Sequence, residues 1–276
     1  MKKLNLLMLS FFVSVIAFAN VSNKERAALI ALYNNTNGAK WNATWDISSP
    51  ITKWQGVKVE GGHVTEIVLP FNNLNGELPS QISDLVYLKK LSLGFNSLKG
   101  KIPIALSGLH NLEVLELFMN KFEGEIPSEL GKLKNLKALK LYSNRLSGNI
   151  PGSLMQLTNL EELLLGSNFL TGGIPDNIYA LSNLKKFSVM DNKMSGNIPV
   201  EMAQLTNLEE LLLSSNEFTG DLPVEFMNLR KLNTIMVSDN NLNKEYISVS
   251  GKNPPVILRL DSPNHNATAT MDIEKE

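Results

Sequence analysis

The segment LSLGFNSLKGKIP, residues 91–103, recurs along the chain at a fixed spacing. It returns as LELFMNKFEGEIP at residues 115–127, LKLYSNRLSGNIP at 139–151 and LLLGSNFLTGGIP at 163–175. Further copies start at Ile67, Phe187, Leu211 and Ile235, so that each copy begins 24 residues after the one before it. A fixed period of this length predicts a solenoid of stacked turns. Every copy contains one asparagine: Asn72, Asn96, Asn120, Asn144, Asn168, Asn192, Asn216 and Asn240.

Positions within a turn are counted from this asparagine as zero. Apolar residues at −5 and −3 alternate with outward residues, which predicts a short strand, and strands of successive turns then pair in parallel about 4.8 Å apart. The asparagine amide can bond backbone N–H and C=O groups where the strand bends into the core. Glycine at +4 fits a turn with positive φ, and proline at +7 keeps the preceding residue extended. These columns are interpreted as structural, with an asparagine-lined ligand site as the alternative.

The first 19 residues resemble a secretory signal. Lys2 and Lys3 precede an apolar run, and Ala19 ends a small-x-small cleavage site. A buried or membrane-spanning helix is the alternative, although the run is shorter than the roughly 20 residues of a membrane span. Cleavage near Ala19 predicts a secreted protein, extracellular or periplasmic, and the short lysine start is typical of bacteria.

Composition excludes several kinds of partner. The formal net charge is −1, and loss of residues 1–19 removes two lysines and no acids, leaving 24 basic and 27 acidic residues. A charge of about −3 does not favour nucleic acid or an anionic membrane. No later stretch is apolar enough to span a membrane. The chain has no cysteine, so it is disulfide-free.

Residues 20–66 are expected to cap the solenoid. Apolar residues at helical spacing predict a helix over 24–33, ended by Gly38 in a left-handed conformation. Alternating residues around Gly61 and Gly62 predict a hairpin that leads into the first repeat strand. The three tryptophans, Trp41, Trp45 and Trp54, all lie here. We interpret them as the plug of the solenoid's open end, with a carbohydrate platform as the alternative.

The pattern LxxLxxLxLxxNxLxGxIPxxLxxL resembles the plant-type leucine-rich repeat of receptor-kinase ectodomains and polygalacturonase inhibitors, a class that secreted bacterial proteins also carry. The resemblance covers residues 24 to about 247. It implies an α/β horseshoe with a parallel β-sheet on the concave side and extra short strands near the LxGxIP segment. The cap is similar to the plant pattern CxWxGVxC, but Thr52 and Val59 stand at the cysteine positions. This departure favours a bacterial secreted member.

The resulting domain prediction has five parts. They are a signal peptide (1–19), an N-terminal helix and hairpin cap (20–66), eight 24-residue turns (67–247), a C-terminal cap (248–262) and a disordered tail (263–276). The C-terminal cap is expected to include a closing strand at 256–260. The tail is predicted from its polar composition.

Catalysis finds little support in the sequence. The three histidines, His63, His110 and His265, lie in the cap hairpin, on a convex segment and in the tail, where they cannot converge. No cysteine nucleophile and no phosphate-binding glycine loop is present. Asp191 and Asp239 occupy the same column two turns apart, but carboxylates at strand ends are usually only solvated. The prediction is a non-enzyme without cofactor or metal.

Binding is predicted at the outward positions −4, −2 and −1 of the concave sheet. Their N-terminal half is aromatic and apolar, and an exposed patch of that kind usually marks a contact site. The alternative is that the aromatics at −1 only cover the strand edge, whereas Phe118 and Tyr142 are expected in mid-strand. The candidate ligand-binding residues are Phe71, Phe95, Phe118, Met119, Tyr142, Met190 and Asp191.

The predicted function is recognition of an extracellular protein or peptide by a monomer, with glycan as a possible ligand. The rival hypotheses are binding to an ordered surface, such as ice or a crystalline polysaccharide, and cell-surface adhesion. An ordered surface requires a flat column of like residues. The column at +3 is mixed instead: Asn75, Lys99, Glu123, Ser147, Thr171, Ser195, Thr219 and Asn243.

Overall fold

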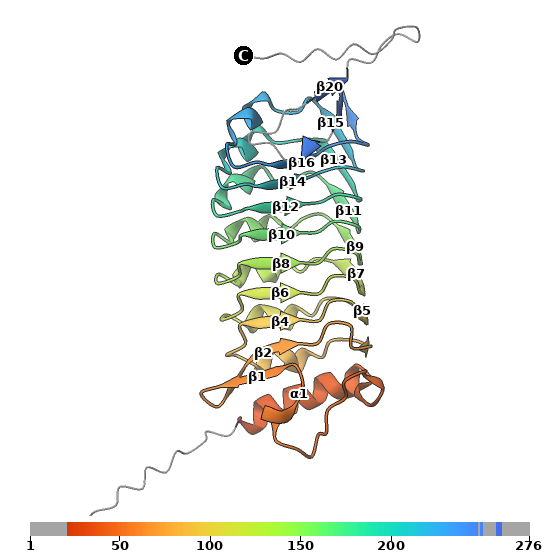
Figure 1. The fold of residues 1–276 in the computed structure, drawn as a ribbon, viewed down its shortest axis with the longest axis vertical. Helices are drawn as coiled ribbons and strands as arrows, with labels where there is room; N and C mark the ends of the chain where they lie inside the picture. Colours follow the sequence, from red (N-terminus) through yellow and green to blue (C-terminus); the bar gives the residue numbers. More distant parts are fainter. Residues whose placement is uncertain (1–20, 248, 251–257, 261–276) are drawn as a thin grey trace, which may run out of the picture.

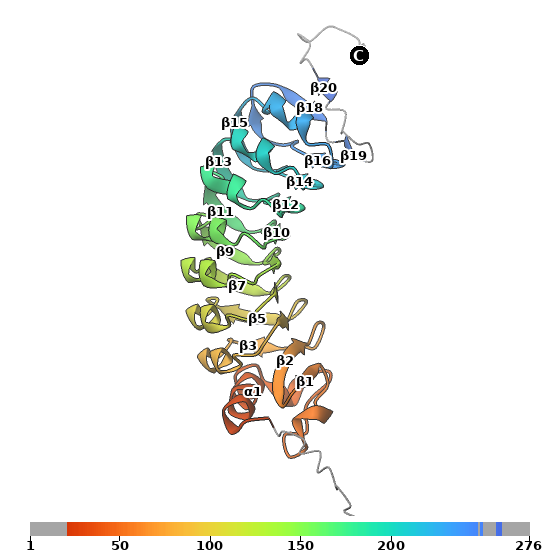
Figure 2. The same ribbon diagram turned by 90° about the vertical axis from the view of Figure 1, so that its left-hand side faces the viewer.

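The computed structural model describes residues 21–247, 249–250 and 258–260, and these form a gently curved stack of turns (Figures 1 and 2). The predicted signal peptide and tail lie outside the described residues. A ten-stranded sheet lines the concave side (Figure 2). Its strands, in spatial order, are β1 (Val57–Glu60), β2 (His63–Val68), β4 (Lys90–Ser92), β6 (Val114–Glu116), β8 (Ala138–Lys140), β10 (Glu162–Leu164), β12 (Lys186–Ser188), β14 (Glu210–Leu212), β16 (Thr234–Met236) and β19 (Val249–Ser250).

The strands from β2 to β16 pair in parallel, with each residue opposite the one 24 positions further on. Antiparallel strands close both ends, because β1 pairs with β2 and β19 pairs with β16. The hairpin predicted around Gly61 and Gly62 is therefore confirmed. These end strands pair backbone groups that would otherwise be free to recruit another chain.

A second, eight-stranded sheet follows the first along one side of the stack (right in Figure 1). The extra short strands that the resemblance implied are confirmed here. They are β3 (Asn75–Gly76), β5 (Ser97–Gly100), β7 (Lys121–Glu125), β9 (Arg145–Gly148), β11 (Phe169–Gly172), β13 (Lys193–Asn197), β15 (Glu217–Gly220) and β17 (Asn241–Leu242).

Short 3₁₀ helices complete the turns on the side away from the concave sheet (Figure 2). Each starts directly after the proline at +7, whose φ lies between −56° and −73°. The helices are η3 (Ser80–Asp84), η4 (Ile104–Gly108), η5 (Ser128–Lys132), η6 (Gly152–Gln156), η7 (Asp176–Ala180), η8 (Val200–Gln204) and η9 (Val224–Asn228).

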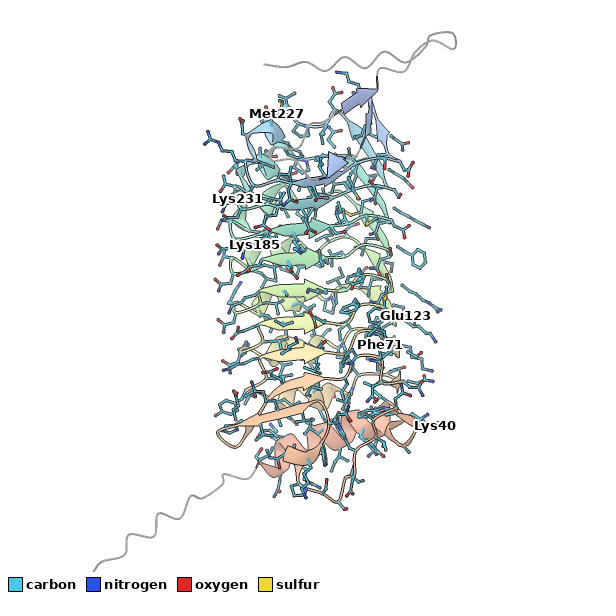
Figure 3. All side chains as sticks on the ribbon, in the orientation of Figure 1. Lys40, Phe71, Glu123, Lys185, Met227 and Lys231 are labelled. Atoms are coloured by element: carbon cyan, nitrogen blue, oxygen red, sulfur yellow. The ribbon has the colours of Figure 1, made fainter. Side chains whose placement is uncertain are left out.

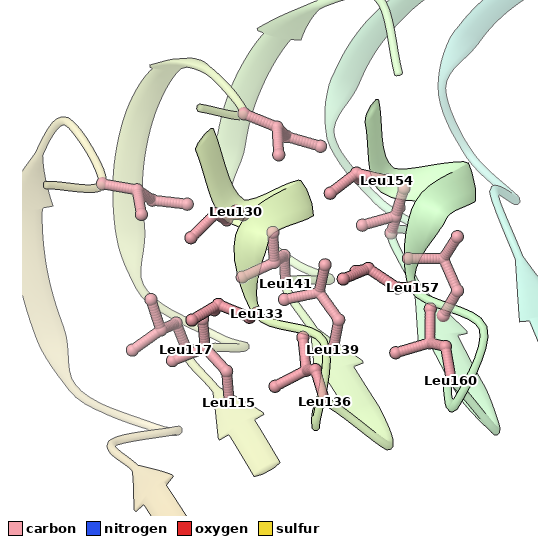
Figure 4. Close-up of a cluster of buried hydrophobic side chains, with 14 of the residues drawn as sticks. Leu115, Leu117, Leu130, Leu133, Leu136, Leu139, Leu141, Leu154, Leu157 and Leu160 are labelled. Atoms are coloured by element: carbon pink, nitrogen blue, oxygen red, sulfur yellow. The ribbon is translucent and has the colours of Figure 1, made fainter. Parts of the chain in front are cut away.

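Leucines from the strands and the 3₁₀ helices meet in one continuous core (Figure 4). Leu115 and Leu117 come from the concave side of one turn, and Leu130 and Leu133 come from its helix and the residue that follows. All four are fully buried. Because each turn buries its apolar face against the next, the stack needs no disulfide to hold it together.

The asparagine column forms a hydrogen-bonded ladder through this core. The Asn144 amide nitrogen donates to the carbonyl oxygens of Leu117 and Leu141, both at 3.0 Å, and its oxygen accepts from the Phe122 N–H at 3.0 Å. Asn96, Asn120, Asn168, Asn192, Asn216 and Asn240 repeat this pattern of donation. At the first turn, the Asn72 oxygen accepts instead from the Ala43 N–H of the cap. The side chains therefore bond the backbone and leave no amide-lined ligand site.

The N-terminal cap begins with α1 (Asn23–Asn35), which carries a capping box between Ser22 and Glu25. The prediction that Gly38 ends this helix in a left-handed conformation is wrong, because Asn37 takes that conformation, with φ of 61°. Gly38 is needed for space instead, since a Cβ there would lie 2.2 Å from the Tyr33 ring. The helix is followed by η1 (Gly38–Lys40) and η2 (Ile51–Lys53).

The three tryptophans are packed against one another inside the cap. Trp45 stacks on Trp54 and meets Trp41 edge to face, with 4.8 Å between ring centroids in both pairs. The exposed fractions of Trp41, Trp45 and Trp54 are 5%, 3% and 2%. No open ring face is left for a sugar, so the carbohydrate platform considered for these residues does not exist.

At the other end, β18 (Glu245–Ile247) pairs in antiparallel fashion with β20 (Leu258–Leu260). The strand β20 falls within the predicted closing strand at 256–260. Residues 256–257 lie outside the described part of the chain. The domain boundaries themselves stay predictions.

Candidate functional site

Positions −6 and −4 supply the strand side chains of the concave face. In β6, Leu115 points into the core, so Val114 and Glu116 on either side of it point outward. The predicted outward positions include −4 but not −6. The strand alternation could have revealed −6, because it extends one step further from the leucine at −5.

Residues at −2 and −1 lie beyond the strand ends. Strand β6 ends at Glu116 and β8 ends at Lys140, so the expectation that Phe118 and Tyr142 lie in mid-strand is wrong. The residue at −1 bends the chain through a left-handed conformation, with φ between 50° and 58° in every described turn. Phe71, Phe95 and Met119 occupy this position, and their side chains border the strands.

Four aromatic rings from successive turns stand in contact, and we term Phe71, Phe95, Phe118 and Tyr142 the aromatic stack. The centroids of Phe71 and Phe95 lie 3.9 Å apart, and those of Phe118 and Tyr142 lie 4.6 Å apart, with the rings nearly parallel in both pairs. Phe95 and Phe118 meet edge to face at 5.3 Å. The structure thus joins four of the predicted site residues into one surface, which starts at Phe71 (Figure 3).

This surface is open to solvent at its N-terminal end. Phe71, Met119 and Phe95 are 62%, 40% and 37% exposed, whereas Phe118 and Tyr142 are half-buried. Stacking closes one ring face of each residue in a pair, which leaves edges and few flat faces for a sugar to cover. The geometry therefore favours side chains that pack along the stack over a sugar ring that lies flat on it.

Gly94 makes room for the stack. A Cβ at this position would lie 2.6 Å from Cζ of Phe118 and 2.8 Å from its two Cε atoms. Only a residue without a side chain lets the Phe118 ring lie over the preceding turn. No sequence pattern indicates this role, because Gly94 lies outside the regular glycine column.

Charged residues of alternating sign run beside the aromatic stack, and we term the set listed here the charge ladder. Lys140 Nζ lies 3.3 Å from Glu116 and 2.7 Å from Glu162. Lys186 Nζ lies 3.9 Å from Glu162 and 3.2 Å from Glu210. Most members thus contact opposite charges on both sides. The ladder consists of Glu66, Lys90, Glu116, Lys140, Glu162, Lys186 and Glu210.

Burial and the charge ladder together shift the pKa values of Lys140 and of Tyr142, which lies two residues further along the chain. Burial alone would lower the pKa of Lys140, but the hydrogen bond and negative charge of Glu162, helped by Glu116, outweigh it and raise that pKa. Burial raises the pKa of Tyr142, Lys140 opposes this, and Glu116 adds to it. Both groups therefore keep their protons at neutral pH: Lys140 is charged and Tyr142 is neutral.

Met190 and Asp191, the remaining predicted site residues, lie two turns further on. Met190 lies over Gly166, where a Cβ would come within 3.1 Å of Met190 Cγ. Asp191 is exposed and has no ion pair among the described residues. The structure does not bring these two residues into the aromatic stack.

The described histidines do not form a catalytic or metal site. His63 stacks on Tyr87, with 3.6 Å between centroids, and its Nδ1 lies 3.4 Å from the buried Glu25 carboxylate. His110 lies on the other side of the solenoid and accepts a hydrogen bond through its backbone oxygen. Among the described residues, no group of three or more histidine or acidic side chains is placed to hold a metal ion.

The second sheet tests the ordered-surface hypothesis through its register. Residues at +3 stand opposite residues at +1 of the next turn, so Ser147 faces Phe169, Thr171 faces Lys193 and Ser195 faces Glu217. Three of the four small polar residues therefore stand opposite an aromatic or charged one, and the fourth, Thr219, stands opposite Asn241. A flat array of like residues does not form.

The family comparison identifies the class of protein. A family model described as "Leucine-rich repeat region" matches residues 105–261, and one described as "Leucine rich repeat" matches residues 62–122. The chain belongs to the leucine-rich repeat family, and the predicted leucine-rich-repeat solenoid is confirmed. Among the described residues, no helix has the length and apolar character that crossing a membrane requires.

Solved structures of plant ectodomains are similar to this chain. The leucine-rich-repeat ectodomain of the Arabidopsis thaliana receptor kinase GASSHO1/SCHENGEN3, in complex with CASPARIAN STRIP INTEGRITY FACTOR 2, is 40% identical over 63% of this chain and 21% of that one, with a TM-score of 0.62. The ectodomain of the Arabidopsis receptor kinase HAESA, in complex with an IDA peptide hormone ligand, is 27% identical over 80% of this chain and 42% of that one, with a TM-score of 0.64. This chain thus spans less than half the length of either ectodomain.

A plant ice-binding protein also has a similar structure. It is 24% identical over 81% of this chain and 88% of that one, with a TM-score of 0.54. At this identity the likeness shows the fold alone.

Proposed function

We propose that this chain is a secreted, non-catalytic recognition module that binds a protein or peptide along the concave face. The observation that carries the proposal is the aromatic stack of Phe71, Phe95, Phe118 and Tyr142, which is open to solvent at Phe71 and Phe95, with the exposed Met119 beside it. Aromatic and methionine side chains are typical anchors of protein interfaces. Burial of such exposed apolar surface by a partner is favourable and contributes to the free energy of binding.

The plant ectodomains support the peptide-binding part of the proposal. GASSHO1/SCHENGEN3 and HAESA are leucine-rich-repeat ectodomains in complex with a named factor and with a peptide hormone ligand, respectively. This chain has the same kind of repeat but covers only part of their length.

The sequence supports export. Residues 1–19 read as a signal peptide cleaved near Ala19, and the missing cysteines at Thr52 and Val59 favour a bacterial source. We propose a monomer in the extracellular space or periplasm, without cofactor. N-terminal sequencing of the exported protein tests the cleavage site, and a mature chain that begins elsewhere than Asn20 would correct it.

The experiment that tests the binding proposal is affinity capture from the native extracellular fluid, followed by measurement of the captured partner's Kd. The Phe118→Ala/Tyr142→Ala variant removes two central rings of the stack. Because truncation of an interface anchor costs more than about 1 kcal/mol, the double variant is expected to bind roughly 30-fold or more weakly.

Phe169→Ala is the matched control. Phe169 is an aromatic residue that is 50% exposed, between the values for Phe95 and Phe71, but it lies on β11 of the second sheet. Its loss is expected to leave the Kd unchanged. Equal binding by wild type and the Phe118→Ala/Tyr142→Ala variant, with both proteins folded, would refute the concave-face proposal.

An ordered surface remains the second candidate. The small polar residues Ser147, Thr171, Ser195 and Thr219 favour it, while the alternation with aromatic and charged neighbours opposes it. Ice-crystal shape and co-sedimentation with crystalline cellulose decide between the two. Shaped ice crystals or saturable sedimentation, lost in Thr171→Ala/Thr219→Ala, would replace the peptide proposal.

A further inference from the structure

The outward residues of the concave face divide into two halves of different charge. At positions −6, −4, −2 and −1, the first four turns carry Lys90 and Lys140 against Glu66 and Glu116, for a net charge of zero. The last four carry Glu162, Asp191, Glu210 and Asp239 against Lys186, for a net charge of −3. We term these last four turns the acidic half. The aromatic stack lies entirely in the other half.

The charge ladder neutralises only part of the acidic half. Glu162 and Glu210 both pair with Lys186, at 3.9 Å and 3.2 Å. Asp191 and Asp239, in contrast, have no ion pair among the described residues, and both are exposed. They share the left-handed position −1, with φ of 55° and 54°, so both carboxylates leave the sheet at the same edge.

A second observation in the acidic half also indicates a ligand. Ser188 is only 6% exposed, and no hydrogen bond to its hydroxyl exists among the described residues. Its neighbour Phe187 is in the core, so Ser188 faces the concave side, between Leu164 and Leu212 of the adjacent strands. The Ser188 oxygen keeps slight contact with solvent, so a ligand that covers this strand has to offer it a hydrogen-bond partner. Ser188 lies three residues before Asp191, on the concave face of the acidic half.

We infer that the ligand is a polypeptide segment that places apolar side chains on the aromatic stack and basic side chains beside Asp191 and Asp239. The inference rests on the proposed function and adds the chemistry of the ligand. A basic segment is the complement of a surface with a net charge of −3, and the neutral half next to it leaves the apolar contacts undisturbed. The Ser188 hydroxyl meets the backbone or a side chain of the same segment.

The geometry of the repeat sets the spacing in the ligand. Asp191 lies two turns beyond Tyr142 and Asp239 lies four turns beyond it, which at about 4.8 Å per strand is about 10 Å and about 19 Å. An extended chain advances about 3.3 to 3.6 Å per residue. The basic residues are therefore expected about three and about six positions from the apolar anchor.

The test is selection of a displayed library of random twelve-residue peptides on the full chain. The selected peptides are expected to carry lysine or arginine about three or six positions from an apolar residue. A second selection on Asp191→Asn/Asp239→Asn is expected to lose the basic residues while keeping the apolar ones. Asparagine is tolerated in the left-handed conformation, so this variant keeps the fold.

Synthetic peptides from the first selection then give affinities. Two exposed ion pairs contribute about 0.2 to 1 kcal/mol each, so Asp191→Asn/Asp239→Asn is expected to bind them about 2- to 30-fold more weakly. The matched control is Asp221→Asn/Glu225→Gln, which removes two exposed carboxylates outside the concave face. It is expected to bind as wild type does.

The outcomes separate this inference from the proposed function. Peptides that depend on Phe118 and Tyr142 but show no basic preference would overturn the inference and leave the proposed function standing. Peptides whose basic residues bind equally well to Asp191→Asn/Asp239→Asn would overturn the placement. No enrichment over an unrelated protein would refute both.

Discussion

Truncation of one rung of the asparagine ladder is expected to destabilise the solenoid without touching the ligand surface. Asn144 is buried, and its amide bonds two carbonyl oxygens and one N–H at 3.0 Å each. In Asn144→Ala the buried Phe122 N–H loses the acceptor that the Asn144 side chain provides. The carbonyl oxygens of Leu117 and Leu141 each keep a second donor, from Asn120 and Asn168.

These contacts set the magnitude. A buried N–H left without a partner costs about 1 to 3 kcal/mol, and each lost bond to a carbonyl that keeps another donor costs about 0.5 to 1 kcal/mol. The variant is therefore expected to lose about 2 to 5 kcal/mol of the free energy of unfolding. Asn149→Ala is the control, because Asn149 is exposed and accepts only from the Thr171 hydroxyl, at 3.1 Å. It is expected to change stability by less than about 0.5 kcal/mol.

Urea denaturation followed by circular dichroism measures the loss, and hydrogen exchange locates it. Because a solenoid is stabilised turn by turn, exchange is expected to speed up first at the amide of Phe122 and its neighbours. Equal urea midpoints for Asn144→Ala and Asn149→Ala, with unchanged exchange at Phe122, would refute the assignment of the ladder as the support of the bends.

Three further predictions concern the cap and the aromatic stack. Trp54→Ala opens a cavity in the cap, because the ring is 2% exposed, and is expected to cost about 3 to 5 kcal/mol in thermal or urea unfolding; a loss below 1 kcal/mol would contradict its role as a plug. Gly94→Ala pushes the Phe118 ring off the preceding turn and is expected to cost about 1 to 2 kcal/mol and to change the near-ultraviolet circular dichroism; an unchanged spectrum would contradict the contact. Burial raises the pKa of Tyr142, so Phe118→Ala is expected to lower that pKa toward 10 in a phenolate titration, and an unchanged titration would count against burial as the cause. Since the folded state holds this proton more tightly than the unfolded state, stability is unaffected below about pH 10 and falls as pH rises through the folded pKa.

The fold could be predicted from the sequence because every turn repeats the same residue types at the same positions. Asparagine, glycine and proline recur at fixed positions, and the structure gives the glycine at +4 a positive φ, as at Gly100 with 75° and Gly148 with 76°. Where the pattern was not repeated, prediction failed. Gly38 was read as a left-handed helix stop, whereas its lack of a side chain serves the packing of Tyr33.

The candidate site was predictable in its members but not in its arrangement. Phe71, Phe95, Phe118 and Tyr142 could be selected as outward residues, yet their contacts depend on how each ring leans across the adjacent turn. That direction follows from the space above Gly94, which only the folded stack shows. The charge ladder was readable in part, since Glu116, Lys140, Glu162 and Lys186 alternate in sign from turn to turn.

The division of the concave face gives its two halves different physical roles. Attraction by Asp191 and Asp239 is screened beyond a Debye length of about 8 Å at physiological salt, so the acidic half acts on orientation and on the rate of encounter. Burial of the aromatic stack depends little on salt and acts on the rate of dissociation. A ligand that needs both halves must align with the axis of the solenoid, because the aromatic stack and the acidic half lie along this axis in a fixed order.

Added salt is therefore expected to slow association with wild type and to leave dissociation nearly unchanged. In Asp191→Asn/Asp239→Asn the salt dependence of association weakens, whereas in Phe118→Ala/Tyr142→Ala it persists and dissociation becomes faster.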